Sequence, residues 1–167
     1  MSARAGTACF FVTLLALASW SCRRSGAVIS SIDDRAGLAG SLRWNPLQWN
    51  VITFSIARND STMSTLYGND VAVRYARMNS QQDYPAGSVL SLVTWVQRED
   101  GHWFGAKIPG PVKSVEFVTV TAGPNNHPTY SYENYEGSPL MRTSASDGRS
   151  PGSRAAYLFS LRASVMP

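Results

Sequence analysis

Cysteine is almost missing from this chain of 167 residues, and both copies, Cys9 and Cys22, lie near the N-terminus. No disulfide can form within residues 23–167, so the fold has to depend on its apolar core. Lysine is also scarce, with Lys107 and Lys113 as the only two. Because 44% of the residues are hydrophobic, the length suits one domain with a sizeable core.

Several kinds of functional motif are missing as well. The sequence has no glycine-rich phosphate loop and no His-x-x-x-His pair. Its two histidines, His102 and His127, are too few to hold zinc or copper without help from carboxylates. The arginines are scattered and do not alternate with aromatic residues. We therefore expect neither a metal site nor a nucleic-acid partner.

The first 22 residues are typical of a signal peptide. Arg4 is followed by an apolar run at residues 10–18, which is shorter than the roughly 20 residues needed to span a bilayer. Residues 17–22 read Leu-Ala-Ser-Trp-Ser-Cys and resemble a relaxed lipobox, which would make Cys22 a lipid attachment site and a membrane tether. The alternatives are ordinary cleavage near Ser21 or after Cys22, or an incidental cysteine. Either way, we expect an exported protein, periplasmic or anchored in the cell envelope.

Residues 23–43 contain many small and polar side chains, and we expect them to form a flexible tether. The tether would begin with the basic pair Arg23-Arg24, and one domain would follow over residues 44–167. The formal net charge of +4 becomes about +3 once Arg4 leaves with the signal peptide.

The first strand of this domain is predicted at residues 48–56, where apolar and polar residues alternate. This pattern places Ile52, Phe54 and Ile56 on the inward face.

A three-strand meander is predicted over residues 83–121. One strand covers residues 88–97, and Glu99-Asp100-Gly101 then forms a hairpin turn. The next strand would pass through residues 102–104, and the Ile108-Pro109-Gly110-Pro111 stretch would separate it from a strand at 112–121.

Helices are predicted on either side of this meander. Residues 61–78 have helical spacing, but Gly68-Asn69 interrupts it, which favours a short first turn and a second helix over Asp70–Met78. A loop at 143–153, expected to be mobile, and a C-terminal helix at 154–163 follow a further strand near Tyr130 and Tyr132. The fold class is α+β, mainly a twisted antiparallel sheet with a helix after the first strand and another at the C-terminus.

Four motifs in the meander resemble the cytochrome P-460 family, a group of small exported bacterial proteins rich in β-structure. They are the Tyr-Pro-Ala-Gly-Ser start at 84–88, Val-Thr-Trp at 93–95, the turn at 102–110 and the strand at 113–118, with a further match at 62–70. The resemblance covers roughly residues 46–139. Haem-carrying members of this family attach their cofactor through Cys-x-x-Cys-His, which this chain does not contain. The resemblance therefore implies the fold with its haem chemistry absent or altered.

Five residues are candidates for a cofactor or ligand site. His102 could ligate a non-covalent haem, and Met63, Tyr67, Trp103 and Phe104 could line an apolar cavity around it. The alternatives are an exposed turn histidine and an ordinary apolar core.

The orientation of Glu116 is open, because alternation with Val115 and Phe117 turns it outward unless the register is inverted. Neither lysine can be assigned to the haem cross-link that some family members carry. Three functions remain: a module that binds haem or a small apolar ligand, a haem-dependent redox enzyme, or a structural envelope protein. A homodimer is compatible with all three.

Overall fold

The computed structural model describes residues 33–78, 83–124, 127–143 and 150–164. The predicted signal peptide, Cys22 and the loop residues 144–149 lie outside these ranges. Backbone contacts divide the chain into Met1–Ile32 and Asp33–Pro167, and the described residues all belong to the second unit.

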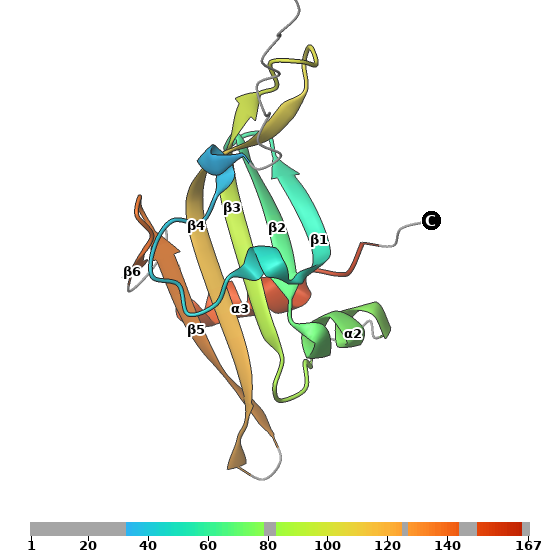
Figure 1. The fold of residues 1–167 in the computed structure, drawn as a ribbon. Helices are drawn as coiled ribbons and strands as arrows, with labels where there is room; N and C mark the ends of the chain where they lie inside the picture. Colours follow the sequence, from blue (N-terminus) through green and yellow to red (C-terminus); the bar gives the residue numbers. More distant parts are fainter. Residues whose placement is uncertain (1–32, 79–82, 125–126, 144–149, 165–167) are drawn as a thin grey trace, which may run out of the picture. The chain divides into compact units, whose positions relative to one another are not determined.

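Six antiparallel strands form one sheet, in which their spatial order follows the chain (Figure 1). Helix α2 (Asp70–Met78) connects the second and third strands, and α3 (Pro151–Ser160) follows the sixth. The 3-10 helices η1 (Asp34–Ala36) and η2 (Pro46–Gln48) precede the sheet. These elements confirm an α+β fold built mainly on an antiparallel sheet. The strands are β1 (Asn50–Ala57), β2 (Thr62–Gly68), β3 (Val89–Glu99), β4 (Lys107–Ala122), β5 (Pro128–Glu136) and β6 (Met141–Thr143).

The prediction of a helical turn just after the first strand is wrong, because residues 62–68 form strand β2. This strand pairs with β1 on one side and β3 on the other, and that pairing overrides the helical spacing of its apolar residues. Ser61 does not cap a helix but has a φ of 49° in the turn between β1 and β2. The second helix does lie where it was predicted, at Asp70–Met78.

Asn69 explains why the chain changes from strand to helix at this point. Its side-chain oxygen accepts the N–H groups of Ala72 (3.0 Å) and Val89 (3.1 Å), so that it caps α2 and binds the start of β3. Gly68 allows close packing beside it, since an added Cβ would lie 2.8 Å from the end of the Ile52 side chain and 3.0 Å from the Ala72 Cβ. Gly68-Asn69, which interrupts the helical pattern of the sequence, therefore forms the junction between β2 and α2.

Strand β1 does not keep the simple alternation that the sequence suggested. Its register with β2 shifts between Val51 and Thr53, which changes the face on which the following residues lie. Ile52 is buried as predicted, but Phe54 and Ile56 are exposed. The inward assignment of these last two residues is therefore wrong.

The Asp100-Gly101 hairpin is confirmed, but the strands on either side of it differ from the prediction. Residues 102–104 belong to the loop between β3 and β4 rather than to a strand. Strand β4 instead starts at Lys107 and continues through Pro109 and Pro111. Irregular pairing with β3 near Trp95 accommodates these prolines, which cannot donate to a regular ladder.

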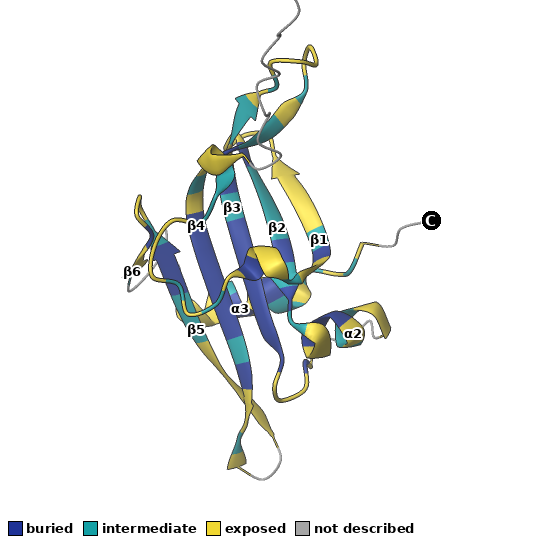
Figure 2. Cartoon of the chain, in the orientation of Figure 1, coloured by how far each residue is buried: buried dark blue, intermediate teal, exposed yellow. Residues whose placement is uncertain are grey.

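The central strands are buried on both faces (Figure 2). Because side chains alternate along a strand, neighbouring residues of β3 and β4 belong to two different cores. One core includes side chains of α2 and α3, and the other includes side chains of residues 36–49. The first contains Leu90, Leu92, Val118 and Val120, and the second contains Val93, Trp95, Val115 and Phe117.

Residues 33–43, which the sequence assigned to a flexible tether, contribute to this second core. Trp95 Nε1 donates to the carbonyl of Ala36 (2.9 Å), and Leu38 and Leu42 pack against the same cluster. The folded unit therefore includes them.

Trp95 joins this N-terminal segment to the sheet, and its truncation should be costly. We expect Trp95→Ala to lower the free energy of unfolding by about 3–5 kcal/mol, because it removes a buried ring. Trp95→Phe keeps an aromatic ring but loses the hydrogen bond to Ala36, and should cost about 1 kcal/mol beyond any packing change. Urea unfolding of both variants measures these values. A loss well below 1 kcal/mol for Trp95→Ala would contradict the burial of this side chain.

Candidate functional site

Glu116 is a carboxylate within the core that includes α3. Its side chain is only 2% exposed and forms a bidentate ion pair with Arg154. Nη2 and Nε of Arg154 donate to the two carboxylate oxygens at 2.6 Å and 2.9 Å. The hydroxyl of Tyr132 donates to the same carboxylate at 2.6 Å. The side chain of Glu116 therefore points into the core beneath α3. Its neighbours Val115 and Phe117 point into the other core, because the central part of β4 is covered on both faces.

This network shifts the proton affinities of its members. Burial, and then the hydrogen bond to Glu116, raise the pKa of Tyr132 far above its usual range. The hydrogen bond to Glu116 also raises the pKa of Arg154. Tyr132 therefore keeps its proton and Arg154 keeps its positive charge, and the guanidinium of Arg154 lies against the Glu116 carboxylate.

Aromatic rings continue from this network beneath α3. Tyr84 stacks on Phe159 with ring centroids 5.7 Å apart, and Tyr130 meets the edge of Phe159 at 5.6 Å. Burial raises the pKa of Tyr84 to about 12. The Glu116–Arg154–Tyr132 network pairs its own charges, and aromatic rings pack beside it. These contacts hold α3 on the sheet.

A hollow of about 510 Å³ lies between residues 40–41 and the β5–β6 edge. Gly40 allows the two segments to approach, since an added Cβ would lie 2.4 Å from the carbonyl oxygen of Leu140. The hollow is lined by Gly40, Ser41, Tyr135, Pro139, Leu140, Met141 and Arg142.

Glu133 organises the polar groups around this hollow. It accepts the hydroxyl of Tyr135 at 3.2 Å and pairs with Arg142 at 3.2 Å. Burial and the neighbouring Glu133 carboxylate raise the pKa of Tyr135, which keeps its hydroxyl protonated. The hollow thus combines an apolar lining with a phenol and a guanidinium, the composition expected of a small-ligand site.

Two smaller hollows flank α2. One, of about 340 Å³, includes Val73 and Arg77, and the other, of about 280 Å³, includes Tyr75 and Pro85. Arg74 and Met78 line both.

The five residues predicted to share a cavity occupy two different regions. His102, Trp103 and Phe104 lie in the loop that connects β3 and β4. Met63 and Tyr67 lie on β2 and pack against the core that contains Trp95. None of the five lines the three hollows.

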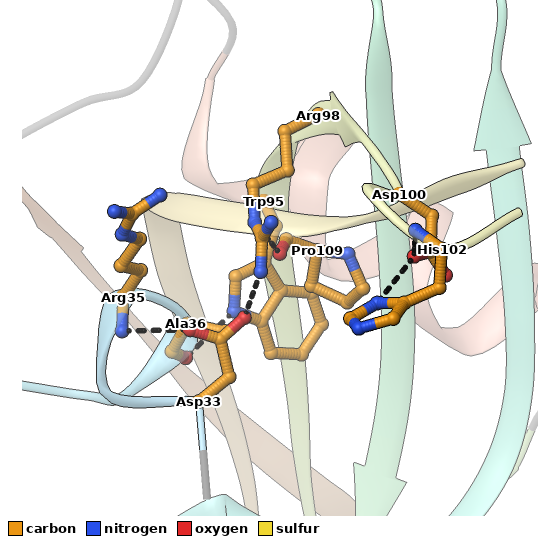
Figure 3. A network of polar contacts seen from close by, with 8 residues as sticks. All are labelled: Asp33, Arg35, Ala36, Trp95, Arg98, Asp100, His102 and Pro109. Carbon is orange, nitrogen blue, oxygen red and sulfur yellow. Dashed lines mark hydrogen bonds and ion pairs between the residues drawn. The ribbon is translucent and has the colours of Figure 1, made fainter. Parts of the chain in front are cut away.

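His102 has a local partner rather than a cavity. Its side chain is 91% exposed, its Nδ1 lies 3.3 Å from Asp100, and its backbone N–H donates to the same carboxylate at 2.8 Å (Figure 3). That backbone hydrogen bond is the main reason why the pKa of Asp100 is lowered. His127 is also exposed.

Ser150 stands in a Gly-x-Ser-x-Gly pattern at residues 148–152, which can mark a nucleophilic serine. Here its hydroxyl accepts the N–H of Ser153 at 3.2 Å and caps α3. Within the described ranges, the other hydrogen bond of this hydroxyl is to the Ser153 side chain. Ser150 is therefore explained by helix capping.

The family relationship agrees with this sheet and its helices. A sequence model of the Cytochrome P460 family matches residues 47–149, which is more than half of the chain. The chain belongs to the Cytochrome P460 family. A comparison with curated proteins finds no match to the chain.

The two histidines of this Cytochrome P460 family protein lie outside the hollows formed by the described residues. Neither His102 nor His127 lines any of the three. Within the described ranges, no group of three or more histidine, cysteine, aspartate or glutamate side chains could hold a metal ion. The hollow of about 510 Å³ offers a phenol, a thioether and a guanidinium.

The Glu116–Arg154 pair predicts a diagnostic stability pattern. Arg154→Met should lower the free energy of unfolding by about 3–5 kcal/mol, because Glu116 would remain buried without a counter-charge. The double variant Glu116→Leu/Arg154→Met should recover most of this loss, since neither charge is then buried. Urea unfolding of the single and double variants measures both effects.

Arg142→Met is the matched control, because Arg142 pairs with Glu133 but its side chain is 64% exposed. It should cost less than about 1 kcal/mol. A double variant as unstable as Arg154→Met would show that the two side chains do not act as a pair.

Proposed function

We propose that this Cytochrome P460 family protein is an exported binding module for a small apolar ligand, without covalently attached haem. The observation that carries the proposal is the hollow of about 510 Å³ between residues 40–41 and the β5–β6 edge. Its volume falls within the range of roughly 300–1,000 Å³ typical of small-molecule sites.

The lining indicates the chemistry of the ligand. Pro139, Leu140 and Met141 offer an apolar surface, which favours an apolar body. Arg142 uses one guanidinium nitrogen toward Glu133 and retains further N–H donors. A ligand with one hydrogen-bond acceptor, such as a carboxylate or carbonyl oxygen, would complement them.

Two observations support the absence of a covalent haem. Both cysteines precede residue 23, outside the family match at residues 47–149. The only histidines, His102 and His127, have no neighbouring cysteine for the Cys-x-x-Cys-His linkage. The scaffold would then serve binding rather than redox catalysis.

The signal-like residues 1–22 support export, and the family resemblance supports a location in the cell envelope. In the described part of the chain, no helix is long and apolar enough to cross a membrane. Cys22 would then supply a lipid anchor or leave with the signal peptide.

Binding can be tested with anilinonaphthalene sulfonate, a fluorescent probe that combines an apolar body with an anionic group. Met141→Glu places a charge in the hollow and should weaken binding about tenfold or more. Met78→Glu is the matched control, because Met78 is similarly exposed but lines the hollows beside α2. Its affinity for the probe should stay unchanged.

Other outcomes would overturn the proposal. Loss of binding in Met78→Glu alone would move the site to α2, and no binding to the wild type would favour a structural protein. Titration with haemin tests the remaining alternative, a protein that binds haem non-covalently. A low-spin Soret spectrum that disappears in His102→Ala would identify a histidine-ligated haem protein instead.

A further inference from the structure

The loop between β3 and β4 carries the most exposed aromatic residues in the described part of the chain. Trp103 is 73% exposed and Phe104 is fully exposed, although both are large apolar side chains. They are consecutive residues of this loop, which closes a hairpin that extends beyond the body of the sheet (Figure 1). Water is a poor environment for such a pair, so the loop is suited to contact another apolar phase.

The N-terminal lead joins the domain at the base of this hairpin. Asp33 forms an ion pair with Arg98, two residues before the loop, and Ala36 accepts the Trp95 ring N–H (Figure 3). Cys22 and Arg23-Arg24 lie only about ten residues upstream of Asp33. An extended segment of that length reaches at most about 35 Å. A membrane anchor at Cys22 would therefore keep this end of the domain close to the bilayer.

The charges around the loop do not oppose such a contact. Three carboxylates lie at this end of the hairpin, and each faces a basic side chain: Asp33 with Arg98, Glu99 with Lys107, and Asp100 with His102. In the neighbouring β1–β2 turn, the exposed side chains of Arg58 and Asp60 offset each other. Two of the three carboxylates are thus neutralised by an arginine or a lysine, and Asp100 is neutralised when His102 is protonated, so this end of the domain presents little net charge to a lipid surface.

We propose that Trp103 and Phe104 insert into the interfacial region of a lipid bilayer and orient the domain with its β3–β4 end toward the membrane. Tryptophan prefers the lipid–water interface, where its ring is apolar and its N–H remains hydrated. For a protein tethered by a lipid on Cys22, the loop would be a second membrane contact, and it would fix the orientation of the domain rather than supply the attachment itself.

Vesicle binding tests this directly. The mature chain with Cys22→Ser, which has no acyl chain, should sediment with vesicles of phosphatidylethanolamine and phosphatidylglycerol and shift its tryptophan emission to the blue. Trp103→Ser/Phe104→Ser should weaken this binding about tenfold or more, because both interfacial anchors are lost. Trp103→Phe should retain binding but lose most of the emission shift.

Val71→Ser/Met78→Ser is the matched control, since both residues are exposed on α2, away from the hairpin. It should bind vesicles like the wild type. Equal loss in both double variants, or no binding by the wild type, would overturn the proposal. So would self-association in sedimentation equilibrium that depends on Trp103 while vesicles cause no shift, because the loop would then contact a second copy of the chain.

Discussion

The buried pair between Glu116 and Arg154 is the interaction on which the arrangement of the C-terminal part depends. A carboxylate inside the core is tolerated only when its charge and both of its oxygens are satisfied. Arg154 and Tyr132 supply this satisfaction from α3 and β5. The pair therefore specifies where α3 lies on the sheet, even though a purely apolar contact could be as stable. The aromatic rings beneath α3 then pack in a fixed place.

The elements with strong local signals were predictable from the sequence. Asp100-Gly101 marked the hairpin, and Asn69 marked the start of α2. Predictions failed where pairing or register overrides the local pattern. Strand β2 lies between two partners, so its ladder hydrogen bonds outweigh the helical spacing of Met63 and Leu66. A register shift in β1 exposed Phe54, and such a shift cannot be read from alternation alone.

The hollow beside β6 could not be predicted because it depends on contacts between distant segments. Residues 33–43 looked like a tether from their small and polar composition, although Leu38 and Leu42 were an available sign of packing. The backbone contact from Leu140 to Ala39 (2.7 Å) brings this segment beside β6. The prediction for His102 failed in the opposite way, because a pocket was expected where the chain is exposed. Its place next to two aromatic residues suggested a pocket, but all three lie on an exposed loop.

The chain has the fold of a Cytochrome P460 family protein, and the central proposal is that it binds a small ligand without covalent haem. The intact mass of the exported protein under denaturing conditions tests this claim most directly, after production in a host that also makes a c-type haem maturation system. We predict the mass of the mature polypeptide, with any additional mass confined to a lipid on Cys22. A mass greater by one haem, with haem absorbance that survives denaturation, would contradict the account.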